Sequence, residues 1–236
     1  MEKALVVGDS LAGGLPHVNF WMQLRKMAGE YSFTVSAVGG EPLAGICSRL
    51  DSLVAETGPD LLILVAGAND ILLPSLRARG GNWLRLVNRI EKRGSLPIED
   101  VNDFLGLYSR TIEKTVVEVE RLIVTTITCL GEDLGSEPNK RRSEYNAAIR
   151  ELAEQNNLVL ADTAKAFDDV LEDVDYPSCY FMDRFICTFT DTFHALVARS
   201  ADTLSGRRGL VLTLDGVHFN RLGARTFAQC VYEAMK

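Results

Sequence analysis

Lys3-Ala4-Leu5-Val6-Val7-Gly8-Asp9-Ser10 carries the chain from a short apolar run into a polar turn. The run predicts a buried strand, and Gly8 permits a tight turn directly after it. A serine at this point lies beyond the carboxyl end of a strand, where open α/β sheets bind their ligands. Ser10 is therefore a candidate nucleophile, although a serine in such a turn can also simply cap a following helix.

The rest of the chain alternates between apolar runs and amphipathic segments. Residues 60–66 form the most strongly apolar run, and its lack of alternation is typical of a parallel strand covered on both faces. Further strands are expected over 31–38, 120–127 and 158–162, and helices over 16–30, 42–56, 98–118, 136–156, 163–174 and 220–235. This order predicts a parallel sheet between two helical layers, an α/β three-layer sandwich. We find no linker or repeat and predict one domain over residues 1–236.

Two stretches do not fit this alternation. Residues 72–97 are basic, contain glycine and carry Trp83 near the middle, while residues 176–209 are rich in phenylalanine and tyrosine in their first half. We read residues 11–16 and both of these stretches as irregular insertions or loops. The aromatic residues are expected either to form the core of a local helical excursion or to build a cap over Ser10, because substrate pockets are mostly apolar.

The composition is that of a globular protein and argues against several classes. The chain is 47% hydrophobic and 24% charged, and its net charge of −7 argues against nucleic acid as a partner. No apolar run approaches the roughly 18 residues of a transmembrane helix, and too few residues precede Gly8 for a signal peptide. We therefore expect a cytoplasmic protein that does not insert into a membrane. The five cysteines are scattered without a C-x-x-C pair, which is typical of reduced thiols rather than of a zinc site.

A second polar turn, Asp215-Gly216-Val217-His218, provides what a serine nucleophile needs. A serine hydroxyl becomes reactive when a base with a pKa near the working pH removes its proton, and histidine is such a base. A carboxylate on the other ring nitrogen holds the imidazole in the required tautomer. Attack on an ester also produces an oxyanion, for which the Ser10 N–H, the N–H of a glycine after the second strand and the Asn69 amide are candidate donors.

These blocks together resemble the SGNH hydrolases, the GDSL esterase/lipase superfamily. Gly8-Asp9-Ser10-Leu11 is similar to the first block, Gly39-Gly40-Glu41 to the second, Gly67-Ala68-Asn69-Asp70 to the third and Asp215-Gly216-Val217-His218-Phe219-Asn220 to the last. Each block alone is weak evidence, but four in the family's order make a specific pattern. The resemblance implies a flavodoxin-like sheet of five parallel strands in the order 2-1-3-4-5.

The resemblance also implies the chemistry and its residues. Ser10, His218 and Asp215 would be nucleophile, base and orienting carboxylate, and the Ser10 N–H, Gly40 and Asn69 would form the oxyanion hole. The expected reaction is hydrolysis of a small-molecule ester or thioester through an acyl-enzyme, with no cofactor and no metal. The sequence leaves open an acyltransferase using the same site and a non-catalytic SGNH-like binding module. It also leaves open the acyl group, the alcohol and the oligomeric state.

Two other histidines are weaker candidates. His17 lies close to Ser10 in sequence, but its place after Pro16 indicates the first turn of a helix pointing away from the site. His194 lies among apolar residues and is more typical of a packed helix than of a ligand. His218 remains the predicted base.

Overall fold

A five-stranded parallel sheet forms the centre of the molecule, and its strands follow the apolar runs of the sequence. The structure is a computed structural model that describes residues 1–13, 18–183, 185 and 198–236. The strands are β1 (Glu2–Gly8), β2 (Tyr31–Ala37), β3 (Leu61–Val65), β4 (Arg121–Thr125) and β5 (Val159–Ala161). They pair in parallel in the order β2-β1-β3-β4-β5, which confirms the predicted topology.

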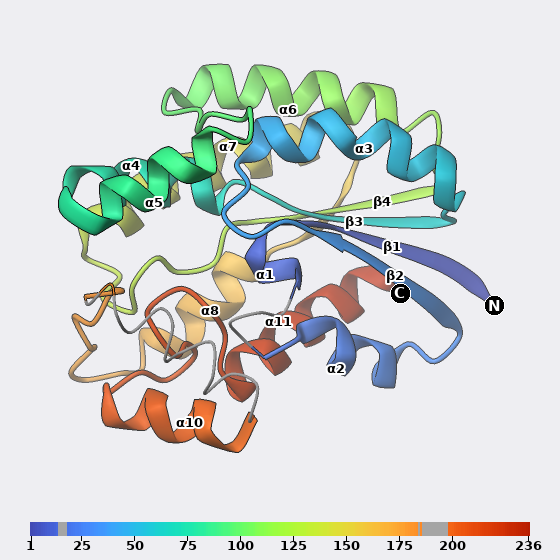
Figure 1. Cartoon of the computed structure of the whole chain (residues 1–236). Coiled ribbons are helices and arrows are strands. Elements are labelled where there is room, and N and C mark those ends of the chain that lie inside the picture. Colours follow the sequence, from blue (N-terminus) through green and yellow to red (C-terminus); the bar gives the residue numbers. More distant parts are fainter. Residues whose placement is uncertain (14–17, 184, 186–197) are drawn as a thin grey trace.

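Helices cover both faces of this sheet, and the strands lie between the two layers (Figure 1). One layer contains α3 (Leu43–Thr57), α4 (Ala68–Ala78), α5 (Gly81–Glu91), α6 (Val101–Thr115) and α7 (Glu137–Gln155). The other contains α2 (Phe20–Met27), α8 (Thr163–Leu171), α10 (Ala198–Arg207) and α11 (Arg221–Met235). The predicted three-layer α/β sandwich is therefore confirmed. Among the described residues, no helix is long and apolar enough to cross a membrane.

The carboxyl ends of β1 and of its two neighbours, β2 and β3, meet at one edge of the sheet. Gly8 pairs with Ala37 of β2 on one side and with Val65 of β3 on the other. A Cβ atom on Gly8 would lie 2.4 Å from the carbonyl oxygen of Val65, so only glycine fits at this point. The loops that follow β1, β2 and β3 therefore start side by side.

The stretch 72–97 is more regular than the sequence indicates. It contains most of α4 and all of α5, which are separated by Arg79 and Gly80; Gly80 and the first residue of α5, Gly81, both have positive φ angles. The buried face of α5 consists of Trp83, Val87 and Ile90 at helical spacing. Exposed basic residues lie between these apolar positions, and because of them the composition of the stretch does not indicate a helix.

Trp83 belongs to the packed side of this helix. Its side chain is buried and its ring packs edge-on against Phe185, with the centroids 5.2 Å apart. Within 176–209, the structure adds the helix α10. Phe189 and Phe193, which the sequence analysis considered for a cap, lie outside the described residues, as do His17 and His194.

The residues after Ser10 also differ from the prediction of a loop. They form a one-turn helix, α1 (Ser10–Gly13), directly after β1. The N–H groups of Ala12 and Gly13 donate to the carbonyl oxygen of Asp9, and the N–H of Leu11 donates to its side chain. Asp9 thus caps this turn.

Candidate active site

Ser10, His218 and Asp215 form a continuous hydrogen-bonded chain at the carboxyl edge of the sheet. His218 Nε2 lies 3.1 Å from Ser10 Oγ, and His218 Nδ1 lies 2.7 Å from Asp215 Oδ2. The side chains of His218 and Asp215 are 8% and 3% exposed. The fold thus brings together residues separated by more than 200 positions, in the geometry by which a histidine can accept a serine proton.

The turn 215–218 is organised by the carboxylate of Asp215. Its Oδ1 accepts the backbone N–H groups of Val217 and His218 at 2.9 and 2.8 Å, while its Oδ2 faces the imidazole. Burial alone would raise the pKa of Asp215, but the imidazole and these N–H groups hold the pKa below its usual value. Asp215 is therefore ionised near neutral pH and can stabilise a positively charged imidazole.

Ser10 does not occupy the capping position that the alternative interpretation of this turn requires. The carboxylate of Asp9 accepts the N–H of Leu11 at 2.8 Å, so the cap of α1 comes from the preceding residue. Asp9 is buried, and this burial raises the pKa of its carboxyl to about 6. The hydroxyl of Ser10 is left to face His218.

The predicted oxyanion residues lie beside this chain of hydrogen bonds. Asn69 is buried, and its amide nitrogen donates to Asp9 Oδ2 at 2.7 Å and to the carbonyl oxygen of Glu41 at 3.2 Å. Gly40 has a φ of +78°, and a Cβ atom there would lie 2.7 Å from Ile90 Cδ1. The backbone conformation therefore favours glycine here, and any larger side chain would also have to displace the end of the Ile90 side chain of α5.

Arg49 fixes the loops after β1 and β2, a contribution that the sequence analysis missed. Its guanidinium, on α3, donates to the carbonyl oxygen of Gly8 at 2.9 Å, to Ser36 Oγ at 2.6 Å and to Glu41 Oε2 at 2.9 Å. The planar fork of arginine suits such divergent acceptors. The only signal in the sequence is an arginine in the first helix after the second block.

Glu132 is a second residue that the sequence analysis missed. Its carboxylate, 1% exposed, accepts four hydrogen bonds: from the N–H groups of Val211, Leu212 and Thr213 and from the hydroxyl of Thr213, at 2.6 to 2.8 Å. Thr213 Oγ1 accepts in turn from the N–H of Gly216. Glu132 therefore anchors the segment that leads into the Asp215–His218 turn. The sequence indicates a role for Glu132 only through its position after the β4 strand.

Asp70 ties the loop after β3 to its neighbours. Its two carboxylate oxygens accept the N–H groups of Leu43 at 2.9 Å and Ile98 at 2.8 Å. Burial raises the pKa of Asp70 to about 7, although both N–H groups oppose the shift. Asp70 thus joins the start of α3 and the segment before α6 to the turn that carries Asn69.

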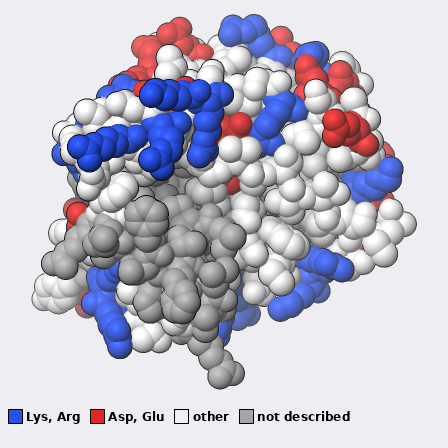
Figure 2. All heavy atoms as spheres, viewed as in Figure 1, with Lys and Arg blue, Asp and Glu red and all other residues white. Residues whose placement is uncertain are grey.

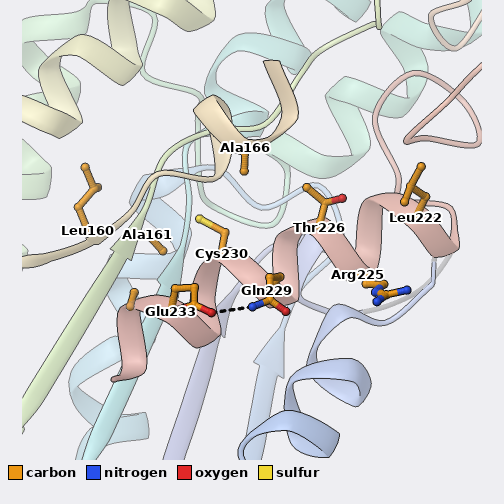
Figure 3. Close-up of a pocket in the computed structure, with 10 residues that line it drawn as sticks. Leu160, Ala161, Ala166, Leu222, Arg225, Thr226, Gln229, Cys230 and Glu233 are labelled. Atoms are coloured by element: carbon orange, nitrogen blue, oxygen red, sulfur yellow. Dashed lines mark hydrogen bonds between the residues drawn. The ribbon is translucent and has the colours of Figure 1, made fainter. Parts of the chain in front are cut away.

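A cavity of about 730 Å³ lies away from these residues, between β5, α8 and α11 (Figure 3). Its lining contains no serine or histidine, and Gln229 donates to Glu233 across one turn of α11 at 2.7 Å. Within the ranges that the structure describes, no group of three His, Cys, Asp or Glu residues could hold a metal ion. The cavity therefore adds no reactive group to the Ser10 site.

Comparison with known proteins agrees with this architecture. An acetylxylan esterase of Geobacillus stearothermophilus is 24% identical over 199 residues, covering 78% of this chain and 85% of that protein. The solved structure of the acetyl xylan esterase AlAXEase superposes with a TM-score of 0.66 at 20% identity, covering 99% of this chain and 100% of that chain. Axe2, an acetylxylan esterase from Geobacillus stearothermophilus, superposes with a TM-score of 0.67 at 16% identity, covering 99% and 94%.

Both structural likenesses show a shared fold, and a family model gives the assignment. The model of the GDSL-like lipase/acylhydrolase family matches residues 6–226 and so includes all four sequence blocks. The resemblance recognised in those blocks is confirmed. The chain belongs to the GDSL-like lipase/acylhydrolase family and is a hydrolase of ester bonds.

Proposed function

We propose that the protein hydrolyses its ester through an acyl-enzyme on Ser10, with His218 as general base and Asp215 as its orienting partner. The observation that carries the proposal is the unbroken chain Ser10 Oγ–His218 Nε2 and His218 Nδ1–Asp215 Oδ2, at 3.1 and 2.7 Å. A nucleophile, a base and an orienting carboxylate within hydrogen-bond distance are the defining geometry of this mechanism.

The reaction proceeds in two halves. His218 removes the proton of Ser10 as Oγ attacks the ester carbonyl, and the resulting imidazolium faces the ionised Asp215. His218 then protonates the departing alcohol, which leaves the acyl group on Ser10. In the second half His218 activates a water molecule that attacks this acyl-enzyme, and the acid departs as the proton returns to Ser10.

The oxyanion of both tetrahedral intermediates is held by the N–H groups of Ser10 and Gly40 and by the Asn69 amide. The two hydrogen bonds of the Asn69 amide differ in length, with 2.7 Å to Asp9 and 3.2 Å to the carbonyl of Glu41. The longer bond is the weaker, so the N–H that makes it is the one that can be given to the oxyanion without moving the amide. Asp9 keeps the amide in place during this exchange.

We further propose that the substrate is an acetyl ester of a carbohydrate. The support comes from the relatives: the 24% identical protein and two of the similar structures are named acetylxylan esterases. An acetyl group also requires little acyl-binding volume, so it needs no dedicated apolar wall above Ser10.

The test is Ser10→Ala, measured on p-nitrophenyl acetate and on acetylated xylo-oligosaccharides. We expect a loss of at least about 10⁴-fold in kcat with an unchanged melting temperature, because the nucleophile is removed while a small, partly exposed hydroxyl contributes little to stability. A fluorophosphonate should label the wild type and not this variant. Ser52→Ala, an exposed position on α3, is the matched control and should keep full activity. Retained turnover or retained labelling in the Ser10 variant would refute the mechanism.

A further inference from the structure

One face of α5 carries a row of exposed basic side chains beside the proposed site. Arg85 and Arg89 lie on α5, Lys92 and Arg93 directly follow its last residue Glu91, and all four side chains are exposed, in contrast to the buried Trp83, Val87 and Ile90. We call these four residues the basic face of α5. Figure 2 shows lysine and arginine side chains gathered over the region where Figure 1 places α4 and α5.

The charge of this face is not compensated locally. Like charges four positions apart, as in the pair Arg85 and Arg89, repel each other and destabilise a helix by about 0.2–0.5 kcal/mol per pair. Glu91, the acidic residue of α5, pairs with Arg77 of α4 instead. In the part of the chain that the structure describes, none of the four lies within 4.0 Å of an Asp or Glu. The protein as a whole carries −7, so this face departs from the general charge.

The basic face begins at the proposed oxyanion turn. Arg93 Nη1 donates to the carbonyl oxygen of Gly39 at 3.0 Å, and Ile90 packs against Gly40. From Lys92 back to Arg85 the helix extends about 10 Å away from this turn. A ligand whose ester carbonyl is held at Gly40 would meet the basic face first at Arg93, and a longer ligand that continues over the exposed side of α5 would reach Lys92 and Arg89.

Resting on the proposed function, we propose that the basic face of α5 binds carboxylate groups of the substrate, so that the preferred substrates are acetylated oligosaccharides carrying acidic sugars. Guanidinium groups match carboxylates in charge and in planar geometry. A bound carboxylate would also relieve the repulsion along the helix. Because the face lies at the rim of the site, its contribution should appear in KM and in salt dependence rather than in the chemical step.

The test compares acetylated xylo-oligosaccharides of equal length with and without a uronic acid side group. We expect the wild type to favour the acidic substrate about tenfold in kcat/KM at low ionic strength, mainly through a lower KM. This preference should be lost in about 0.5 M salt, because that concentration shortens the screening length to a few Å. The triple variant Arg85→Gln, Arg89→Gln and Lys92→Gln should lose the preference, so that its kcat/KM is about equal for the two substrates. It leaves Arg93 on Gly39 untouched.

Two controls separate the possible failures. Arg25→Gln with Lys26→Gln changes two exposed charges on α2, in the other helical layer, and should keep the preference. Hydrolysis of p-nitrophenyl acetate should be equal in all variants; if the wild type lacks it, the proposed function itself fails. If that activity is present but the wild type shows no preference, or the triple variant keeps it, the assignment of the basic face is overturned. Binding of DNA or of phosphatidylserine vesicles that the triple variant loses, without any substrate preference, would also overturn it.

Discussion

Two buried carboxylates, Asp9 and Glu132, hold the loops of the proposed site mainly through N–H donors. Asp9 accepts from Leu11 and from the Asn69 amide, and Glu132 accepts from three consecutive backbone N–H groups and a hydroxyl. A buried charge is costly unless such donors replace its hydration. Protonation of either carboxylate, or its replacement by an amide, should therefore change stability or activity measurably.

The ionisation of Asp9 should make stability depend on pH. Its pKa is about 6 in the folded protein against a usual value of 3.8, so the folded state retains a proton that the unfolded state has lost between these values. The free energy of unfolding should therefore fall as the pH rises through this window, by about 3 kcal/mol in total from this group.

The Asp9→Asn variant isolates this contribution. Denaturant unfolding at pH 4 and pH 7 should show that the stability of the wild type relative to the variant decreases by about 2.4 kcal/mol over the interval. Asp70, whose pKa is about 7, contributes in the same direction to both proteins, and it contributes less in the variant because the charge of Asp9 helps to raise its pKa. A difference that stays constant with pH would contradict a raised pKa at Asp9.

Glu132→Gln should impair catalysis although Glu132 touches no reacting group. One carboxylate oxygen becomes an NH₂ group that faces a backbone N–H, at Val211 or at Leu212 and Thr213, so at least one hydrogen bond is lost. We expect the segment before Asp215 to shift and kcat to fall by about tenfold or more, since small displacements of catalytic groups are expensive.

The measurement is kcat together with the apparent pKa of the base in the pH profile, which a purely structural loss would not move. The matched control is Glu137→Gln, the same change on an exposed side chain at the start of α7, which should leave both quantities unchanged. Equal kinetics for the Glu132 variant and the wild type would show that the anchor is dispensable.

At the level of elements, the first turn of α11 is packed against the segment that Glu132 holds. Asn220 caps this helix by accepting the N–H of Gly223 at 3.0 Å. A Cβ atom on Gly223 would lie 2.1 Å from the carbonyl oxygen of Leu212, which is backbone and cannot simply rotate away. The close approach of helix and loop therefore depends on a glycine.

Gly223→Ala should destabilise the protein by about 1–3 kcal/mol, the usual cost of overpacking. Gly206 is the matched control, since it also lies in a helix, α10, and a Cβ atom there would meet nothing within 4 Å. Gly206→Ala should stabilise by about 0.5–1 kcal/mol through helix propensity. Denaturant unfolding measures both, and effects of the same sign would contradict the packing argument.

At the level of the whole molecule, the two helical layers share one sheet, so we predict a single cooperative unit over residues 1–236. The two tryptophans report on opposite layers: Trp21 lies on α2 and Trp83 on α5. Unfolding followed by fluorescence in Trp21→Phe and in Trp83→Phe should coincide in each variant with unfolding followed by far-UV circular dichroism. A layer whose tryptophan changes at a separate denaturant concentration would reveal a second folding unit.

The sequence by itself determined the sheet and the residues to suspect. Strands such as β3 are continuous apolar runs because both of their faces are covered, and a local pattern is enough to recognise them. The order of the four blocks led to the family and, with it, to Ser10, Gly40, Asn69, Asp215 and His218. These residues could be predicted from the sequence because each block is a contiguous turn.

Tertiary structure decided how those turns are held. The contact of Glu132 with residues 211–213 joins positions about 80 residues apart, and the clamp by Arg49 joins α3 to two strands. That Asp9 rather than Ser10 caps α1, and that α5 packs on Gly40, likewise depends on side chains meeting in space. Such contacts leave no period in the sequence, because a single buried donor or acceptor is satisfied by geometry and not by its neighbours in the chain.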